Sequence, residues 1–295
     1  LIVYPNHGAG SACGKNMSKE TTDTLGHQKE VNYALNPALN KEEFIKAILT
    51  GLTPPPGYFP KNVLMNIQGY ESLDTVLERG HKALTAENFV MVANETNALV
   101  LDTRNATDFA NGFIPNSINI GLDGSFAQWV GEMIPDIKQE ILLVSNPGYE
   151  DEAMIRLSRV GYDGSIGYLE GGFDAWKKAG KEVDTVKRIT AEQFATIHEN
   201  EKPLTIDIRK KSEFQSQHIT DAVNIPLNEI NNHLAEFPKD KPFILHCAGG
   251  YRSMIAASML KQRGWDNFSD VIGGFTEIAK TNVPKSEYIC PSTML

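Results

Sequence analysis

The chain has 295 residues, of which 41% are hydrophobic and 22% are charged, so it can fill the cores of about two ordinary domains. Its 28 Lys and Arg residues against 37 Asp and Glu residues give a net charge of −9, which argues against a nucleic-acid binder that depends on a basic surface. No apolar run approaches the roughly 20 residues that cross a bilayer. Three widely spaced cysteines exclude a disulfide framework and a cysteine-rich zinc site. We therefore expect a reducing, cytoplasmic setting, with neither nucleic acid nor membrane as a partner.

The first residues lack the features of an independent start. Residues 1–5 contain no initiator Met, no basic segment and too short an apolar run for a signal peptide. Residues 41–50 predict one amphipathic helix, and the proline-rich stretch 53–60 predicts an extended connection. We therefore expect residues 1–76 to be the C-terminal part of a larger domain.

The rest of the chain contains a duplication. Three segments recur at an offset of 102 to 105 residues: 84–89 as 189–194, 99–104 as 204–209, and Gly171-Gly172-Phe173 as Gly273-Gly274-Phe275. A repeat of this length indicates two homologous domains and not a solenoid module. We place them at residues 77–184 and 185–295.

Short β-branched runs alternate with a helical pattern in the second repeat. Residues 204–208, 243–246 and 270–272 are predicted strands, and 254–263 is a predicted helix that ends at Gly264. Strand, helix and strand joined by short turns indicate a parallel sheet flanked by helices. The predicted fold class is therefore α/β.

The strongest site signal is the sequence FILHCAGGYRS at residues 243–253. The apolar strand should bring Cys247 to the carboxyl edge of the sheet, where open α/β sheets build their sites. Gly249 and Gly250 let the backbone curl, so that successive N–H groups and the start of the next helix face an anion. Arg252 adds a cation. Such surroundings favour the thiolate, the nucleophilic form of cysteine.

This loop resembles the active-site loop of rhodaneses, the thiosulfate or persulfide sulfurtransferases. The resemblance covers both repeats and implies that Cys247 takes up a sulfane sulfur as a persulfide, which Arg252 and the loop amides stabilise. The sulfur then passes to a small acceptor, a thiol, sulfite or cyanide, without a cofactor. The resemblance also implies substrate contacts from Ala248, Gly249, Gly250, Tyr251 and Ser253.

Two other functions stay open at this point. A cysteine phosphatase or arsenate reductase shares the Cys and Arg pattern, but it needs a wider loop than the four residues 248–251. A non-catalytic sulfur carrier or docking module would bind the persulfide without multiple turnovers. A homo-oligomer is compatible with the sequence.

Several charged residues near the loop have counterparts in the first repeat. Asp207, Arg209 and Glu213 correspond to Asp102, Arg104 and Asp108. Because the repeat without a cysteine keeps them, we expect structural ion pairs and not catalysis. We expect His246 to be a strand-end residue and not a general base.

The first repeat lacks the catalytic pattern. At the offset of 102, Cys247 corresponds to Ser145 and Arg252 to Glu150, and Pro147 removes one loop N–H group. We therefore expect a non-catalytic domain that fixes the position of Cys247.

The beginning of the chain resembles a different family. Residues 4–14, YPNHGAGSACG, and then residues 24–39 are similar to a late segment of metallo-β-lactamase-fold proteins of the glyoxalase II and persulfide dioxygenase group. The resemblance implies the C-terminal portion of an αββα domain, fused to tandem rhodanese domains as in bacterial persulfide-handling proteins. The diagnostic His-x-His-x-Asp-His motif is absent from the chain.

This second resemblance implies a metal site in the intact protein. His7 would be a ligand of non-haem iron or zinc only together with an upstream part, and Cys13 would be an accessory sulfur-carrying thiol. The intact protein would then act as a persulfide dioxygenase or hydrolase on low-molecular-weight persulfides, sulfite and thiosulfate. No role is predicted for Cys290.

Overall fold

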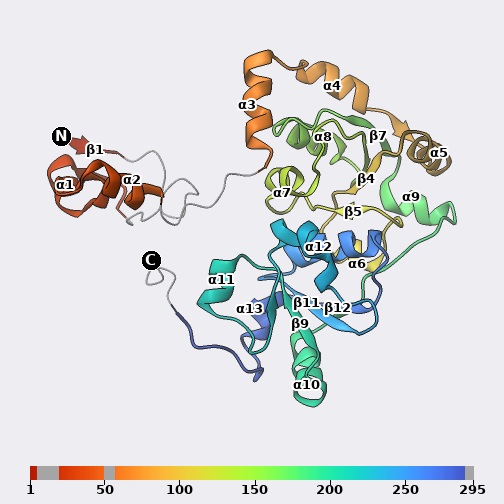
Figure 1. Ribbon diagram of the computed structural model, residues 1–295. Helices are drawn as coiled ribbons and strands as arrows, with labels where there is room; N and C mark the ends of the chain where they lie inside the picture. The colour runs from red at the N-terminus through yellow and green to blue at the C-terminus, as the bar shows by residue number, and fades with distance from the viewer. Residues whose placement is uncertain (5–19, 50–56, 290–295) are drawn as a thin grey trace. The chain divides into compact units, whose positions relative to one another are not determined.

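The computed structural model describes residues 1–4, 20–49 and 57–289. The chain divides into two compact units, whose described parts are residues 1–4 with 20–49 in the first and residues 57–289 in the second (Figure 1). Within these described ranges no helix is both long enough and apolar enough to span a membrane.

The first unit consists of a short strand pair and small helices. Its elements are β1 (Ile2–Val3), β2 (Asp23–Thr24), α1 (Leu25–Val31), the 3-10 helix η1 (Tyr33–Leu35) and α2 (Lys41–Leu49). Strands β1 and β2 are antiparallel, and α2 confirms the predicted helix as far as residue 49. None of the described residues in this unit is buried. His7, Cys13 and Cys290 lie outside the described residues, so the predictions made for His7 and Cys13 stay predictions.

The second unit contains two five-stranded parallel sheets. The first sheet has the strands β3 (Ala83–Leu84), β4 (Leu99–Asp102), β5 (Ile118–Asn119), β6 (Ile141–Val144) and β7 (Ser165–Leu169). The second has the strands β8 (Arg188–Ile189), β9 (Leu204–Asp207), β10 (Val223–Asn224), β11 (Phe243–His246) and β12 (Phe268–Val271). The orders β3-β7-β6-β4-β5 and β8-β12-β11-β9-β10 are equivalent strand for strand. The predicted α/β class and duplication are therefore confirmed.

Helices cover both sheets. In the first repeat they are α5 (Ala86–Thr96), α6 (Ala106–Asn111), α7 (Phe126–Met133), α8 (Glu150–Ser158) and α9 (Gly172–Lys178). In the second they are α10 (Ala191–Glu201), α11 (Lys211–Ser216), the 3-10 helices η2 (Leu227–Asn232) and η3 (Leu234–Glu236), α12 (Tyr251–Gln262) and α13 (Gly274–Ile278). Two further helices, α3 (Phe59–Gln68) and α4 (Leu73–Gly80), precede the first sheet. Helix α4 packs against β7 and α8, so this compact unit begins ahead of residue 77.

The central strands follow the sequence pattern closely. Strand β11 covers the predicted residues 243–246, and all four of its residues are buried, as are those of β6. Such continuous apolar runs are typical of parallel strands that helices cover on both faces. The strand predicted at 270–272 lies slightly earlier, at β12.

Helix α12 joins the two repeats. It packs against β11 and β12 of its own sheet and against β5 of the first, where the Asn119 N–H donates to Ser258 Oγ at 2.9 Å. Figure 1 shows α12 where the two repeats meet. The helix predicted at 254–263 is confirmed, but it begins earlier, at Tyr251, and every residue from Ser253 to Leu260 is buried. The cause is the first repeat, which covers the face that would otherwise meet solvent.

Candidate active site

Cys247 lies directly after β11, at the carboxyl end of the central strand. It lines a cavity of about 570 Å³ and is only 1% exposed. The Gly250 N–H donates to its Sγ at 3.1 Å. Gly250 has a φ of 102°, a conformation that glycine adopts without steric cost. The loop therefore directs a backbone donor at the sulfur, as an anionic sulfur species requires.

The repeated Gly-Gly-Phe motif supports this loop from behind. The Phe275 N–H donates to the Cys247 carbonyl oxygen at 2.7 Å, and the Thr276 N–H donates to that of Ala248 at 3.0 Å. A Cβ atom on Gly274 would lie 2.4 Å from the Cys247 carbonyl oxygen, so this approach requires glycine. Since the C=O and N–H groups of one trans peptide point in opposite directions, fixing these carbonyls on α13 turns the following N–H groups the other way. The sequence shows the motif through its recurrence but does not show this role.

Arg252 is held by a carboxylate at the cavity wall. Its two terminal nitrogens form a bidentate ion pair with Glu213 of α11, at 2.6 and 2.9 Å. Partial burial acts to raise the pKa of Glu213, but the hydrogen bond and charge of Arg252 outweigh it and hold that pKa below its usual value. Glu213 thus pairs with Arg252 and not with Arg209. The sequence grouping had not indicated this partner.

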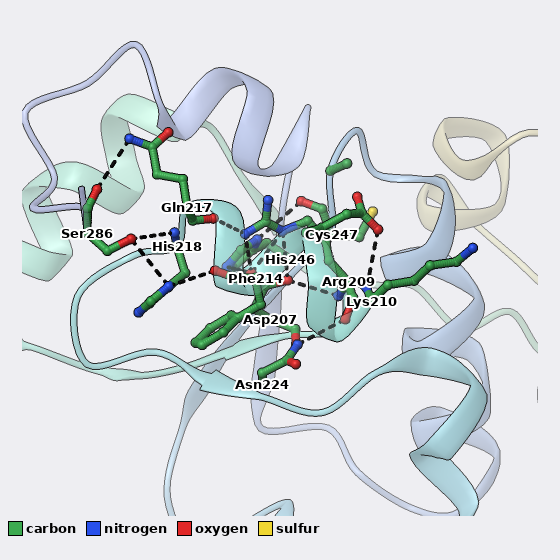
Figure 2. A network of polar contacts seen from close by, with 12 residues as sticks. Asp207, Arg209, Lys210, Phe214, Gln217, His218, Asn224, His246, Cys247 and Ser286 are labelled. Carbon is green, nitrogen blue, oxygen red and sulfur yellow. Dashed lines mark hydrogen bonds and ion pairs between the residues drawn. The ribbon is translucent and has the colours of Figure 1, made fainter. Parts of the chain in front are cut away.

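Asp207 and Arg209 form a separate buried pair beneath the loop (Figure 2). Arg209 Nη2 lies 2.7 Å from Asp207 Oδ2 and also donates to the Gln217 carbonyl. The guanidinium stacks 4.0 Å over the ring of Phe275. In the first repeat Arg104 and Asp102 show the same arrangement, with Phe173 under the guanidinium at 4.1 Å. A pair present in both repeats supports a structural role.

The two ring nitrogens of His246 lie near groups other than the sulfur of Cys247. Its ring is fully buried, with Nδ1 at 3.2 Å from the Cys247 carbonyl oxygen and Nε2 at 3.9 Å from Asp207 Oδ2. Burial lowers its pKa, although the charge of Asp207 acts in the opposite direction. This placement supports a strand-end role and gives no path for His246 to act as a base on the thiol.

The predicted binding residues take different places. Gly249 and Tyr251 line the cavity, whereas Gly250 and Ala248 shape the loop. Ser253 is fully buried, and its hydroxyl donates to the Gly250 carbonyl at 3.2 Å. The structure therefore gives no support to the prediction that Ser253 contacts substrate, because the hydroxyl is used below the loop.

The first repeat supplies one wall of the cavity. Its contributing residues are Gly124, Ser125, Gln128 and Trp129, and the second repeat adds Lys210. The Tyr251 hydroxyl donates to the Gly121 carbonyl at 2.7 Å across the repeat boundary. Sequence analysis missed these residues because nothing in the pattern of either repeat shows which surfaces meet.

In the first repeat the groups of the equivalent loop are used in hydrogen bonds to side chains of the same repeat. Ser145 Oγ lies 2.7 Å from Thr103 Oγ1, and the Glu150 carboxylate accepts the Gly148 N–H at 2.8 Å. A carboxylate thus takes the amide that corresponds to the one facing Cys247.

Comparison with known proteins assigns both repeats. The rhodanese-like domain family matches residues 85–179 and 190–281, more than half of the chain. The chain belongs to the rhodanese-like family. Thiosulfate sulfurtransferase GlpE of Pseudomonas syringae is 34% identical over 99 residues, which are 34% of this chain and 92% of that protein. The uncharacterized protein YqhL of Bacillus subtilis is 36% identical over 90 residues, 30% of this chain and 70% of that protein. Sulfur transfer is therefore an activity of relatives of these rhodanese-like domains.

Solved structures give similar matches. A rhodanese-related protein of Thermoplasma volcanium is 31% identical, with a TM-score of 0.31, over 34% of this chain and 97% of that one. A metallo-β-lactamase of Staphylococcus aureus is 30% identical, with a TM-score of 0.44, over 58% of this chain. The chain spans 45% of that protein. Among the described residues, no group of three or more His, Cys, Asp or Glu side chains is placed to hold a metal ion.

Proposed function

We propose that the second rhodanese-like domain transfers sulfane sulfur through a persulfide on Cys247. The observation that carries this proposal is the Gly250 N–H directed at Sγ from 3.1 Å, in a cavity that also contains Arg252. An amide donor at this point stabilises the Cys247 thiolate, which attacks the sulfur donor and is released again when the sulfur passes to the acceptor.

The reaction then has two balanced steps. The Cys247 thiolate attacks the outer sulfur of thiosulfate, the S–S bond of the donor breaks, and sulfite leaves with the electron pair. An acceptor thiolate or cyanide next attacks the terminal sulfur of the persulfide. The bond between that sulfur and Sγ breaks, and its electron pair returns Cys247 to the thiolate. Each step is a nucleophilic displacement at sulfur.

In this proposal the Arg252 guanidinium is a fixed cation that binds the anionic sulfur donor in the cavity beside Cys247. Because Glu213 holds both of its terminal nitrogens, the guanidinium is fixed in direction and its charge is partly balanced. The short loop between Cys247 and Arg252 supports sulfur transfer over phosphate-ester hydrolysis, which needs a wider cradle.

Mass spectrometry tests the first step. Thiosulfate should add one sulfur, about 32 Da, to the tryptic peptide that contains Cys247, and Cys247→Ser should abolish both the label and thiocyanate formation. The same preparation should not hydrolyse p-nitrophenyl phosphate. Unchanged thiocyanate formation by Cys247→Ser would remove the basis of the proposal, and phosphatase turnover would favour the alternative.

We further propose that the first compact unit, whose described residues are 1–4 and 20–49, derives from a metallo-β-lactamase-like domain, so that the intact protein is also a metal-dependent persulfide dioxygenase or hydrolase. The sequence pattern around His7 and Cys13 supports this proposal. The intact protein would hold non-haem iron or zinc, with His7 as one ligand, in a cytoplasmic setting. Elemental analysis tests the ligand assignment: this chain should not retain stoichiometric iron or zinc, because it supplies one ligand of a site that needs three or more. Retention of one equivalent would contradict it.

A further inference from the structure

Among the residues that the structure describes, one cation lining the cavity above Cys247 has no carboxylate partner within ion-pair distance. Arg252 is paired with Glu213, so their charges balance. Lys210 also lines the cavity, and among the described residues its ammonium makes no ion pair. Figure 2 shows its side chain extended away from the buried Asp207–Arg209 network. Apart from the sulfur of Cys247, the side chains lining the cavity therefore leave a net charge of +1, located at Lys210.

The opposite wall offers uncharged polar groups. Ser125 and Gln128 come from the first repeat and line the same cavity, next to the indole of Trp129. The carboxylate that acts electrostatically on Lys210 is Glu132, one turn further along α7, and burial raises the pKa of Glu132 against the effect of the lysine. A hydroxyl, an amide and an ammonium around one space form a site for a carboxylate.

The size of the cavity favours an organic thiol over a small inorganic anion such as thiosulfate or sulfite. About 570 Å³ lies within the range of sites for organic small molecules, roughly 300–1,000 Å³. Thiosulfate or sulfite alone would leave most of this space to water. An organic thiol with a carboxylate at its far end would fill more of the cavity and would place its negative charge near the Lys210 ammonium.

We propose that the sulfur acceptor is a small thiol that carries a carboxylate, bound with the carboxylate between Lys210 and Gln128 and with its sulfur toward Cys247. This inference rests on the proposed persulfide of Cys247. In the transfer the acceptor thiolate attacks the terminal sulfur of the persulfide and releases the Cys247 thiolate. The product is the acceptor persulfide, with two negative charges on the sulfur atoms before and after the step. The first repeat thereby becomes part of the acceptor site.

Matched acceptors test this assignment. We would first load Cys247 from thiosulfate and verify the added mass of about 32 Da, and then measure transfer to 3-mercaptopropionate and to 3-mercaptopropan-1-ol. The pair 6-mercaptohexanoate and 6-mercaptohexan-1-ol covers a longer reach. For at least one of the two pairs, we expect the carboxylate thiol to have a kcat/KM about three- to tenfold higher than the matching alcohol thiol. Most of the difference should come from a lower KM for the carboxylate thiol, and added salt should reduce it.

Variants assign the preference to residues. Lys210→Gln should remove it, Lys210→Arg should keep it, and Gln128→Leu should reduce it. Lys211→Gln is the matched control, because Lys211 pairs with Glu229 at 3.0 Å and does not line the cavity. It should leave the preference unchanged.

The outcomes separate this inference from the proposed function. Failure to load Cys247 contradicts the persulfide itself. Normal loading without a charge preference, a preference that survives in Lys210→Gln, or transfer confined to sulfite overturns the acceptor site alone.

Discussion

Ser145 and Cys247 occupy the same place in the two repeats, directly after the central strand of each sheet. Below them the scaffolds agree closely, since each repeat has a buried Asp–Arg pair under a phenylalanine ring. Above them the loops differ. One loop directs an amide at a thiol, whereas the other gives the corresponding amide to the carboxylate of Glu150.

The difference shows how a duplicated domain divides its tasks. The first repeat has lost the groups that hold an anion, but its α7 region lines the cavity of the second repeat and its β5 packs on α12. The buried length of α12 depends on that contact. The repeat without the thiol is therefore part of the site and more than the spacer that the sequence predicts.

The sharpest way to break this comparison is to restore the thiol in the first repeat. Ser145→Cys in a Cys247→Ser background should give no measurable thiocyanate formation. Pro147 lacks one donor and Glu150 brings negative charge to the loop, so a thiolate there would have no stabilising environment. Circular dichroism should show an unchanged fold. Turnover by this variant would mean that the loop differences do not decide activity.

The shared ion pairs predict equal losses of stability in both repeats. Asp102→Asn and Asp207→Asn each leave a guanidinium that is about 95% buried without its carboxylate. Each should lower the free energy of unfolding by about 3–5 kcal/mol, measured by urea titration. A cost confined to Asp207→Asn would show that the equivalent pair in the first repeat does not stabilise its domain.

Much of this scaffold is predictable from sequence, because strand periodicity and the repeat offset report burial against a domain's own sheet. Strand β11 and the position of Cys247 follow from one apolar run and one glycine pair. The wall from Ser125 to Trp129 does not, since it depends on how two finished domains dock. The complete burial of α12 was missed for the same reason, because its outer face packs on the first repeat.

A third prediction concerns a buried pair that the first repeat lacks. Asp270 on β12 binds Arg188 at 3.0 Å, where the first repeat has Tyr168 beside Ala83. Burial raises the pKa of Asp270 to about 6. Between the ordinary pKa of 3.8 and this value the folded state holds a proton that the unfolded state has lost, so the contribution to stability falls as pH rises.

Urea titrations between pH 4 and pH 7 measure this effect. The stability advantage of the wild type over Asp270→Asn should shrink by up to about 3 kcal/mol across that range. Tyr168→Phe at the corresponding place should change stability by an amount that does not depend on pH. A constant difference for Asp270→Asn would show that the carboxyl group titrates normally.

The smallest predicted effect is a difference in the free energy of unfolding between variants of two equivalent tyrosines, Tyr251 and Tyr149. Tyr251 reaches across to the first repeat and donates to the Gly121 carbonyl, whereas Tyr149 at the same loop position is 51% exposed. Tyr251→Phe should lower the free energy of unfolding by about 0.5–1.5 kcal/mol, because a carbonyl loses its donor. Tyr149→Phe should stay within about 0.5 kcal/mol of the wild type.

A glycine on the other side of this contact sharpens the result. A Cβ atom on Gly124 would lie 2.4 Å from the Tyr251 ring, so Gly124→Ala must displace the ring. We expect it to reduce thiosulfate turnover more than Tyr251→Phe does, because it moves the loop beside Cys247 and does not only remove one hydrogen bond. Gly57→Ala, with no atom within 4 Å of the added Cβ, is the matched control. Equal turnover in Gly124→Ala and Gly57→Ala would show that the catalytic loop keeps its position when the Tyr251 ring is displaced.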